Sequence, residues 1–429
     1  MYPALELRRC EPSFEEDLQS FVEKYTALWN TSGAETPVLD TTYTAAEQQS
    51  NELQTGRLTG SMESELRNYP GRKKQQSAWR ERVFLMLRQF GKASFRFPDS
   101  HFDIIFSPEY FEATKAFVHK ARAFDQKMET EALAQALRNV WVMNCLQMFL
   151  GRRPSLAPSM FAYSMLYPFT DNYLDRTDLS HEAKETANGR LELRLAGRDL
   201  DPLNAHEAAI FRLVGMIEGE YSREHFPDVY RSLLAIHAGQ VKSLCQQGRR
   251  CVMNEESLLR ISIEKGGTSV LADGWLVSGM LRREEAEFFF GFGVMLQLLD
   301  DLQDLPDDLQ AGHWTLFVRA ASHEYLDGLT NRLWNFMNRV LDLTDCGTNP
   351  DGLELKDLIR RNCRMLLLRS VAESASHYSG GYLRRMERLS PLRFAFLRDR
   401  RSVAQARFAA IWPALSRRHN LRSIFDLLG

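Results

Sequence analysis

Five aspartates follow directly after an apolar stretch, and no other residues of this sequence are better placed to do chemistry. The stretch from Phe288 to Leu299 carries no charge, and the acids after it are Asp300, Asp301, Asp304, Asp307 and Asp308. If the helix continues, Asp300, Asp304 and Asp308 lie one above another on one face. Like charges so arranged repel one another, and hard cations such as Mg²⁺ prefer carboxylate oxygens. The pattern therefore indicates a cation site; the alternative is a solvated acidic turn.

A second acidic segment earlier in the chain has the same layout. A helical apolar stretch begins near Pro158 and runs into Asp171 and Asp175, which are one helical turn apart. Tyr163 and Tyr167 precede Asp171 on the same face. Two such segments favour one shared metal site, toward which these two aromatic rings would also point.

Cations between the two acidic segments are candidates for binding an anion. Lys265 precedes Gly266 and Gly267, and this glycine pair predicts a break or kink in the helix that exposes backbone groups beside the lysine. Lys265 and Arg176 are therefore expected to contact phosphate oxygens. A row of three further arginines is interpreted mainly as a solvated face paired with Glu192 and its neighbours, with a diphosphate contact as the minority interpretation: Arg190, Arg194 and Arg198.

These segments together resemble the class I isoprenoid (terpenoid) synthase superfamily. Asp171 to Asp175 is similar to the DxxxD motif of squalene and phytoene synthases. Gln297 to Asp304 resembles the QxxDDxxD motif of trans-prenyl diphosphate synthases, and Asp304 to Asp308 is similar in spacing to the second motif of squalene and phytoene synthases. The resemblance covers roughly residues 130 to 320. It implies an all-α helical bundle around a central cavity, in which both motifs face a cluster of three Mg²⁺ ions.

The resemblance implies a Mg²⁺-dependent terpene synthase, which ionises a linear prenyl diphosphate and cyclises or rearranges the resulting cation. The catalytic residues would be Asp171, Asp175, Asp300, Asp301, Asp304 and Lys265, and the metal ligands Asp171, Asp175, Asp300, Asp301, Asp304 and Asp308. The substrate would be bound by Lys265, Arg176, Gln297, Tyr163, Tyr167, Phe289 and Phe292. The aromatic members of that set would stabilise the carbocation through their ring faces.

Two other functions remain open. A prenyltransferase that elongates or couples prenyl chains would use the same acids, although the first motif is not DDxxD followed by two arginines. A noncatalytic helical protein could keep the scaffold and bind without turnover. The arginine-rich stretch from Arg384 to Arg401 is interpreted as a solvated helix, with a peripheral contact to lipid headgroups as the alternative. A homodimer is also left open.

Length and composition set the frame for these predictions. The chain has 429 residues and a formal net charge of -2, which gives no overall field for nucleic acid. Its six cysteines form no CxxC pair, and no apolar run is long enough to span a membrane, so a cytoplasmic protein is expected. Residues 1–75 are predicted to be an N-terminal extension with a helix over Phe14 to Trp29 and a loop over Asn30 to Arg72. Residues 76–429 are predicted to form one α-helical domain.

Overall fold

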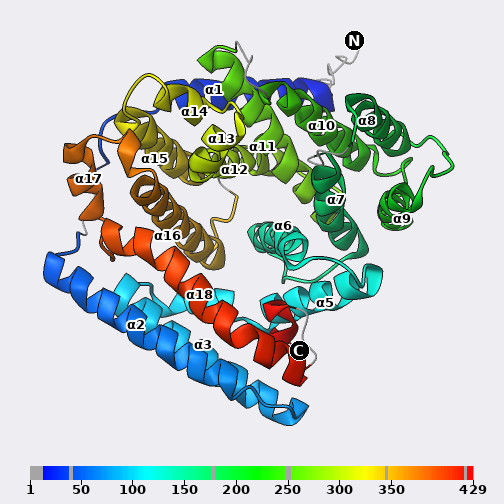
Figure 1. The fold of residues 1–429 in the computed structure, drawn as a ribbon. Helices are drawn as coiled ribbons and strands as arrows, with labels where there is room; N and C mark the ends of the chain where they lie inside the picture. Colours follow the sequence, from blue (N-terminus) through cyan, green and yellow to red (C-terminus); the bar gives the residue numbers. More distant parts are fainter. Residues whose placement is uncertain are drawn as a thin grey trace, which may run out of the picture.

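The computed structural model describes residues 13–37, 42–174, 179–247, 253–343, 346–419 and 423–428. These residues form α-helices, with three short 3₁₀ helices and one isolated bridge between Gln247 and His313, and the described part contains no strand (Figure 1). The predicted all-α class is therefore confirmed. None of the described helices is both long and apolar enough to cross a bilayer.

Two antiparallel helices form the centre of the fold. They are α11 (Glu255–Ser278) and α12 (Arg283–Gln303), and no other pair of helices packs together so extensively. Three further helices surround them in the larger hydrophobic core: α1 (Phe14–Asn30), α15 (Asp327–Asp342) and α16 (Pro350–Glu373). The rings of Phe21 and Tyr25 on α1 pack against Phe290 of α12, with centroids 5.8 and 5.9 Å apart. The predicted helix near the N-terminus therefore exists, and it is part of this core.

A second hydrophobic core lies on the other side of α11. It contains α5 (Pro108–Phe124), α6 (Thr130–Phe149), α7 (Pro158–Leu174), α9 (Ala205–Glu220) and α10 (Pro227–Ser243). Residues of α11 belong to both cores, for example Ile263 to the first and Leu276 to the second. The helix that carries Lys265 is thus fixed on two sides by apolar packing.

A third group of helices lies along one edge of the molecule (Figure 1). It consists of α2 (Ala45–Arg67), α3 (Lys73–Phe95) and α18 (Phe394–His419), with a small apolar cluster of its own. The remaining helices are α4 (Asp99–Ile105), α8 (His181–Leu195), α13 (Leu305–Ala311), α14 (Leu316–Ala321) and α17 (Gly380–Glu387).

The loop predicted over residues 30–72 is wrong, because α2 occupies most of that range. Thr44 and Glu47 form a capping box at its start. The helix is then held by polar contacts to the chain between α17 and α18: the Gln48 amide donates to the Glu387 and Ser390 carbonyls at 2.7 and 2.9 Å. The Glu52 carboxylate also pairs with Arg393. A helix docked by buried polar groups lacks the apolar periodicity on which the prediction relied.

The helix break predicted at Gly266 and Gly267 is also wrong, because α11 runs through both glycines. Both are buried against α12. A Cβ atom on Gly266 would lie 2.6 Å from the Gly293 carbonyl oxygen, and one on Gly267 would lie within 2.6 Å of the Phe290 ring. The glycines therefore let two helix backbones approach closely, which is a packing role and not a backbone opening.

Candidate functional site

The acids of the second segment lie across the boundary between α12 and α13. Helix α12 ends at Gln303, Asp304 caps it, and α13 begins at Leu305. The helical turns continue through this boundary, since the Asp304 N–H donates to the Asp300 carbonyl at 2.9 Å and the Asp308 N–H donates to the Asp304 carbonyl at 2.8 Å. Asp300, Asp304 and Asp308 therefore keep the stacked arrangement that the sequence predicts.

Burial and crowding make the carboxyls of Asp300 and Asp304 hold their protons more tightly than usual. Burial, followed by repulsion from Asp300 and Asp308, raises the pKa of Asp304 to about 7. Burial also raises the pKa of Asp300, although Lys265 and Arg138 oppose that shift. The Asp300 and Asp304 side chains are nevertheless exposed to solvent.

Asp301 differs from its neighbours because its carboxylate is already occupied. Its side chain is only 6% exposed. The Ser262 hydroxyl on α11 donates to it at 2.7 Å, and the Gln297 amide donates to it at 2.8 Å. Burial raises the pKa of Asp301 to about 6, and these two hydrogen bonds oppose the shift. The bond from Ser262 to Asp301 thus ties α12 to α11, and the Gln297 amide holds the same carboxylate from within α12. The metal role predicted for Asp301 and the substrate role predicted for Gln297 stay predictions.

Two cations act electrostatically on this carboxylate group. Burial raises the pKa values of Asp300 and Asp301, and Lys265 on α11 opposes the rise at both while Arg138 on α6 opposes it at Asp300. Arg138 was not among the predicted site residues. A signal for it existed in the sequence: it is the only charged residue between Ala132 and Leu150, within the otherwise uncharged stretch of α6.

The first acidic segment lies at the end of α7, antiparallel to α11. The Ser159 hydroxyl donates to the Leu276 carbonyl at 2.9 Å, and two turns further along α7 the Tyr167 hydroxyl bonds Ser269. One more turn leads to residue 171 on α7 and to Lys265 on α11. The backbone at residue 171 therefore lies level with the turn of α11 that carries Lys265. The Asp171 side chain and the whole of Asp175 and Arg176 fall in parts of the chain that the structure does not describe.

The aromatic residues predicted to line a cavity are mostly packed in the cores. Phe289 is fully buried, and Phe292 packs against Phe149 and Phe288 with ring centroids 6.2 Å from each. Tyr163 is buried and packs edge-on against the half-buried Tyr167. A pocket between α7, α8 and α10 touches both tyrosines, but its volume of about 30 Å³ has room for roughly one water molecule. Phe289 and Phe292 are thus buried in the core, and their contact with substrate stays a prediction.

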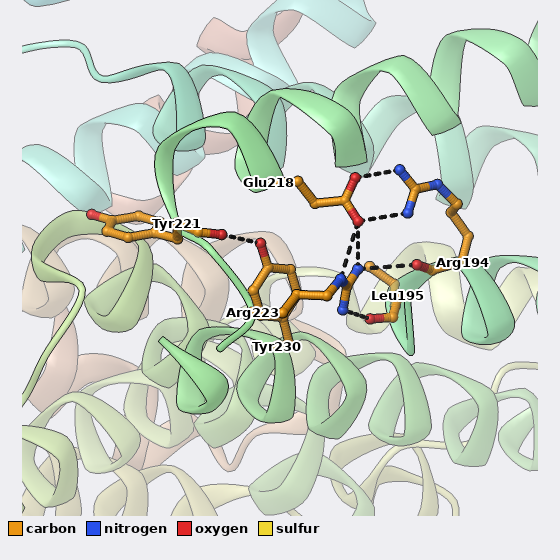
Figure 2. Close-up of polar contacts among 6 residues, drawn as sticks. All are labelled: Arg194, Leu195, Glu218, Tyr221, Arg223 and Tyr230. Atoms are coloured by element: carbon orange, nitrogen blue, oxygen red, sulfur yellow. Dashed lines mark hydrogen bonds and ion pairs between the residues drawn. The ribbon is translucent and has the colours of Figure 1, made fainter. Parts of the chain in front are cut away.

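The arginines of α8 are used in ion pairs with α9, not with Glu192. Arg190 pairs with Glu207 at 2.6 Å. Figure 2 shows the second pair, in which both terminal nitrogens of the Arg194 guanidinium donate to the Glu218 carboxylate. Arg223 donates to the same carboxylate at 2.8 Å. Arg223 also donates to the Leu195 carbonyl at 2.6 Å and so caps the end of α8. The minority interpretation, a diphosphate contact, has no support in these pairings.

The donor chemistry at residues 300–308 suits Mg²⁺, and the set of ligands is incomplete there. Asp300, Asp304 and Asp308 supply carboxylate oxygens, which Mg²⁺ takes in small numbers together with water and phosphate oxygens. Among the described side chains, no group of three or more His, Cys, Asp or Glu residues is arranged to hold a metal ion. A complete site would need ligands from the first acidic segment.

A larger pocket of about 350 Å³ lies between α8 and α9, beside Tyr173 at the end of α7. None of the acids at 300–308 lines it. Comparisons of the chain with family models, with curated proteins and with solved structures give no match.

Proposed function

We propose that this protein is a class I terpene synthase that ionises a linear prenyl diphosphate in a Mg²⁺-dependent reaction and releases pyrophosphate. One observation carries the proposal: the pairing of α7 with α11 puts the backbone of residue 171 level with Lys265. The charge of Lys265 in turn opposes the rise in pKa that burial causes at Asp300 and Asp301. Two acidic segments that are far apart in the sequence would thus converge on the turn that carries Lys265.

The charged residues near this turn would each have a different role in binding a diphosphate. Lys265 and Arg138 would contact its oxygens through charge-assisted hydrogen bonds, and they would stabilise the negative charge that develops on the departing group. Asp300, Asp304 and Asp308, with Asp171 and Asp175, would hold Mg²⁺, which neutralises the leaving group as a Lewis acid. Asp301 would act indirectly, because its bond to Ser262 fixes the position of α12 against α11.

Incubation with single substrates tests the proposal. The purified chain would be mixed with Mg²⁺ and geranyl, farnesyl, geranylgeranyl or geranylfarnesyl diphosphate, and both pyrophosphate and organic products would be measured. A hydrocarbon or alcohol formed together with pyrophosphate from one diphosphate alone is the expected result. Products that require isopentenyl diphosphate would identify a prenyltransferase instead, and no turnover of any substrate would favour a binding protein.

Two double variants test whether the first acidic segment belongs to the active site. D171N/D175N should abolish turnover and leave the helical content unchanged, because only the metal-binding oxygens are altered. D199N/D201N removes two exposed acids from the connection between α8 and α9, and it serves as the matched control that should retain activity. Equal activity in both variants would remove the first acidic segment from the site.

A further inference from the structure

Five exposed cations gather at one corner of the molecule, where the turn between α2 and α3 meets the end of α18 (Figure 1). We call this corner the basic tip: Arg67, Arg72, Lys74, Arg417 and Arg418. The two segments are in contact there, since the rings of Tyr69 and His419 meet edge to face at 5.1 Å. An apolar cluster that includes Leu66, Trp79 and Leu415 lies beneath them. The cations are therefore presented by packed helices.

The charge of the basic tip is not neutralised by the protein. No ion pair in the described part of the chain includes any of the five cations, and the nearby Glu65 carboxylate pairs with Arg82 at 3.2 Å. The chain as a whole has a formal charge of -2. The tip is thus a local excess of positive charge on a protein whose net charge is slightly negative.

Helix stability explains three of these cations and not the other two. Arg67, Arg417 and Arg418 lie in the last turns of α2 and α18, where cations offset the helix dipole. Arg72 and Lys74 lie at the start of α3, where the dipole disfavours them. The first turn of α3 contains no acid, and Arg72 makes no capping hydrogen bond. The stability of α3 therefore does not account for Arg72 and Lys74, which leaves binding to an external partner as their role.

We infer that the basic tip docks this protein on an anionic lipid surface. Each Lys or Arg near such a surface strengthens binding by about fivefold, and the five cations converge on one projecting corner. The choice of lipid over nucleic acid rests on the proposed function, because a prenyl diphosphate is amphiphilic and its hydrocarbon product dissolves in a bilayer. Docking would hold the enzyme at the surface where product is taken up.

Co-sedimentation of the full chain with vesicles, without substrate, tests this inference. The protein should bind vesicles of phosphatidylcholine with phosphatidylserine, should not bind phosphatidylcholine alone, and should be released by high salt. The variant R72S/K74Q should lower the partition coefficient about 30-fold, at about fivefold for each cation. The control R231Q/K242Q removes two exposed cations from α10, which lies apart from the basic tip (Figure 1), and should stay within about twofold of the parent.

The thermal stability of R72S/K74Q separates docking from a structural role. Because serine is a good N-cap residue and lysine opposes the dipole, this variant should melt at the same temperature as the parent or higher. The second variant, R417Q/R418Q, should lose vesicle binding to a similar extent.

Four results would overturn the inference: equal binding to neutral vesicles, equal loss in the α10 control, unchanged binding in both tip variants, or binding to an RNA duplex in place of vesicles. Vesicle binding by a protein that turns over no prenyl diphosphate would leave the docking surface standing and reject only the proposed function.

Discussion

Replacing Gly266 by alanine tests the contact on which the geometry of the site depends. Gly266 on α11 faces Gly293 and Gln297 on α12, and a Cβ there would lie 2.6 Å from the Gly293 carbonyl oxygen. That oxygen belongs to the backbone and cannot rotate away, so the two helices would have to separate. The same pair of helices holds the Ser262 to Asp301 hydrogen bond and brings Lys265 close to Asp300.

The expected cost follows from two opposing effects. Overpacking a well-packed contact costs about 1–3 kcal/mol, and the upper end applies here because a backbone atom is in the way. Alanine in a helix interior is better than glycine by about 1 kcal/mol. The net prediction for G266A is a loss of about 2 kcal/mol in the free energy of unfolding.

Gly215 provides the matched control, because it lies inside α9 with no atom within 4 Å of the position a Cβ would take. G215A should gain about 1 kcal/mol from helix propensity alone. Urea unfolding of both variants, followed by circular dichroism, should therefore give changes of opposite sign. A stabilised G266A would refute the close-contact interpretation, because it would mean that α11 has room for a Cβ at this position.

The remaining predictions concern titration of buried and crowded acids. Asp304 has a pKa of about 7, so its carboxylate opposes folding increasingly as pH rises from about 4 through 7; D304N should raise the melting temperature at pH 8 and have little effect at pH 4. D304N should also weaken the Mg²⁺ dependence of turnover more than D307N does, because Asp307 lies off the shared face. Asp273 is fully buried and its carboxyl accepts from Asn139 at 3.0 Å. Burial holds its pKa well above the ordinary range, so stability is lost as pH rises above about 4. D273N should therefore stabilise the protein at pH 7 in a thermal melt, and a destabilised variant would mean that the carboxyl is needed in its charged form.

The all-α class was predictable because apolar periodicity marks helices that are buried on one face. Helices α1 and α5 follow it, whereas the continuous apolar stretches of α6 and α12 mark helices that are buried nearly all round. Helix α2 was missed because Gln48, Asn51 and Glu52 make its buried contacts, and polar residues leave no apolar stripe to detect. Its capping residues, Thr44 and Glu47, were the available signal.

The sequence predicted which residues make up the candidate site better than it predicted the role of each residue. The spacing of Asp300, Asp304 and Asp308 was enough to place them on one face. Spacing could not show that Asp301 is turned toward Ser262, because that bond depends on how α11 packs. Phe289 and Phe292 were assigned to a cavity from their place in the sequence, whereas α1, α11 and α16 cover the helix that carries them.

Crowding carboxylates at the end of α12 destabilises the fold, and the apolar packing of the same helix offsets that destabilisation. Leu298, Leu299 and Leu302 are buried within one turn of Asp300, and each fully buried side chain of this kind contributes about 1.5–3 kcal/mol. Repulsion between like charges four residues apart costs only a few tenths of a kcal/mol per pair on an exposed helix. The core can therefore hold the acids in place without a ligand. Any ligand that neutralises them, such as a cation bridging to a phosphate, would then stabilise the folded chain, and a rise in melting temperature would reveal such binding without any assay of turnover.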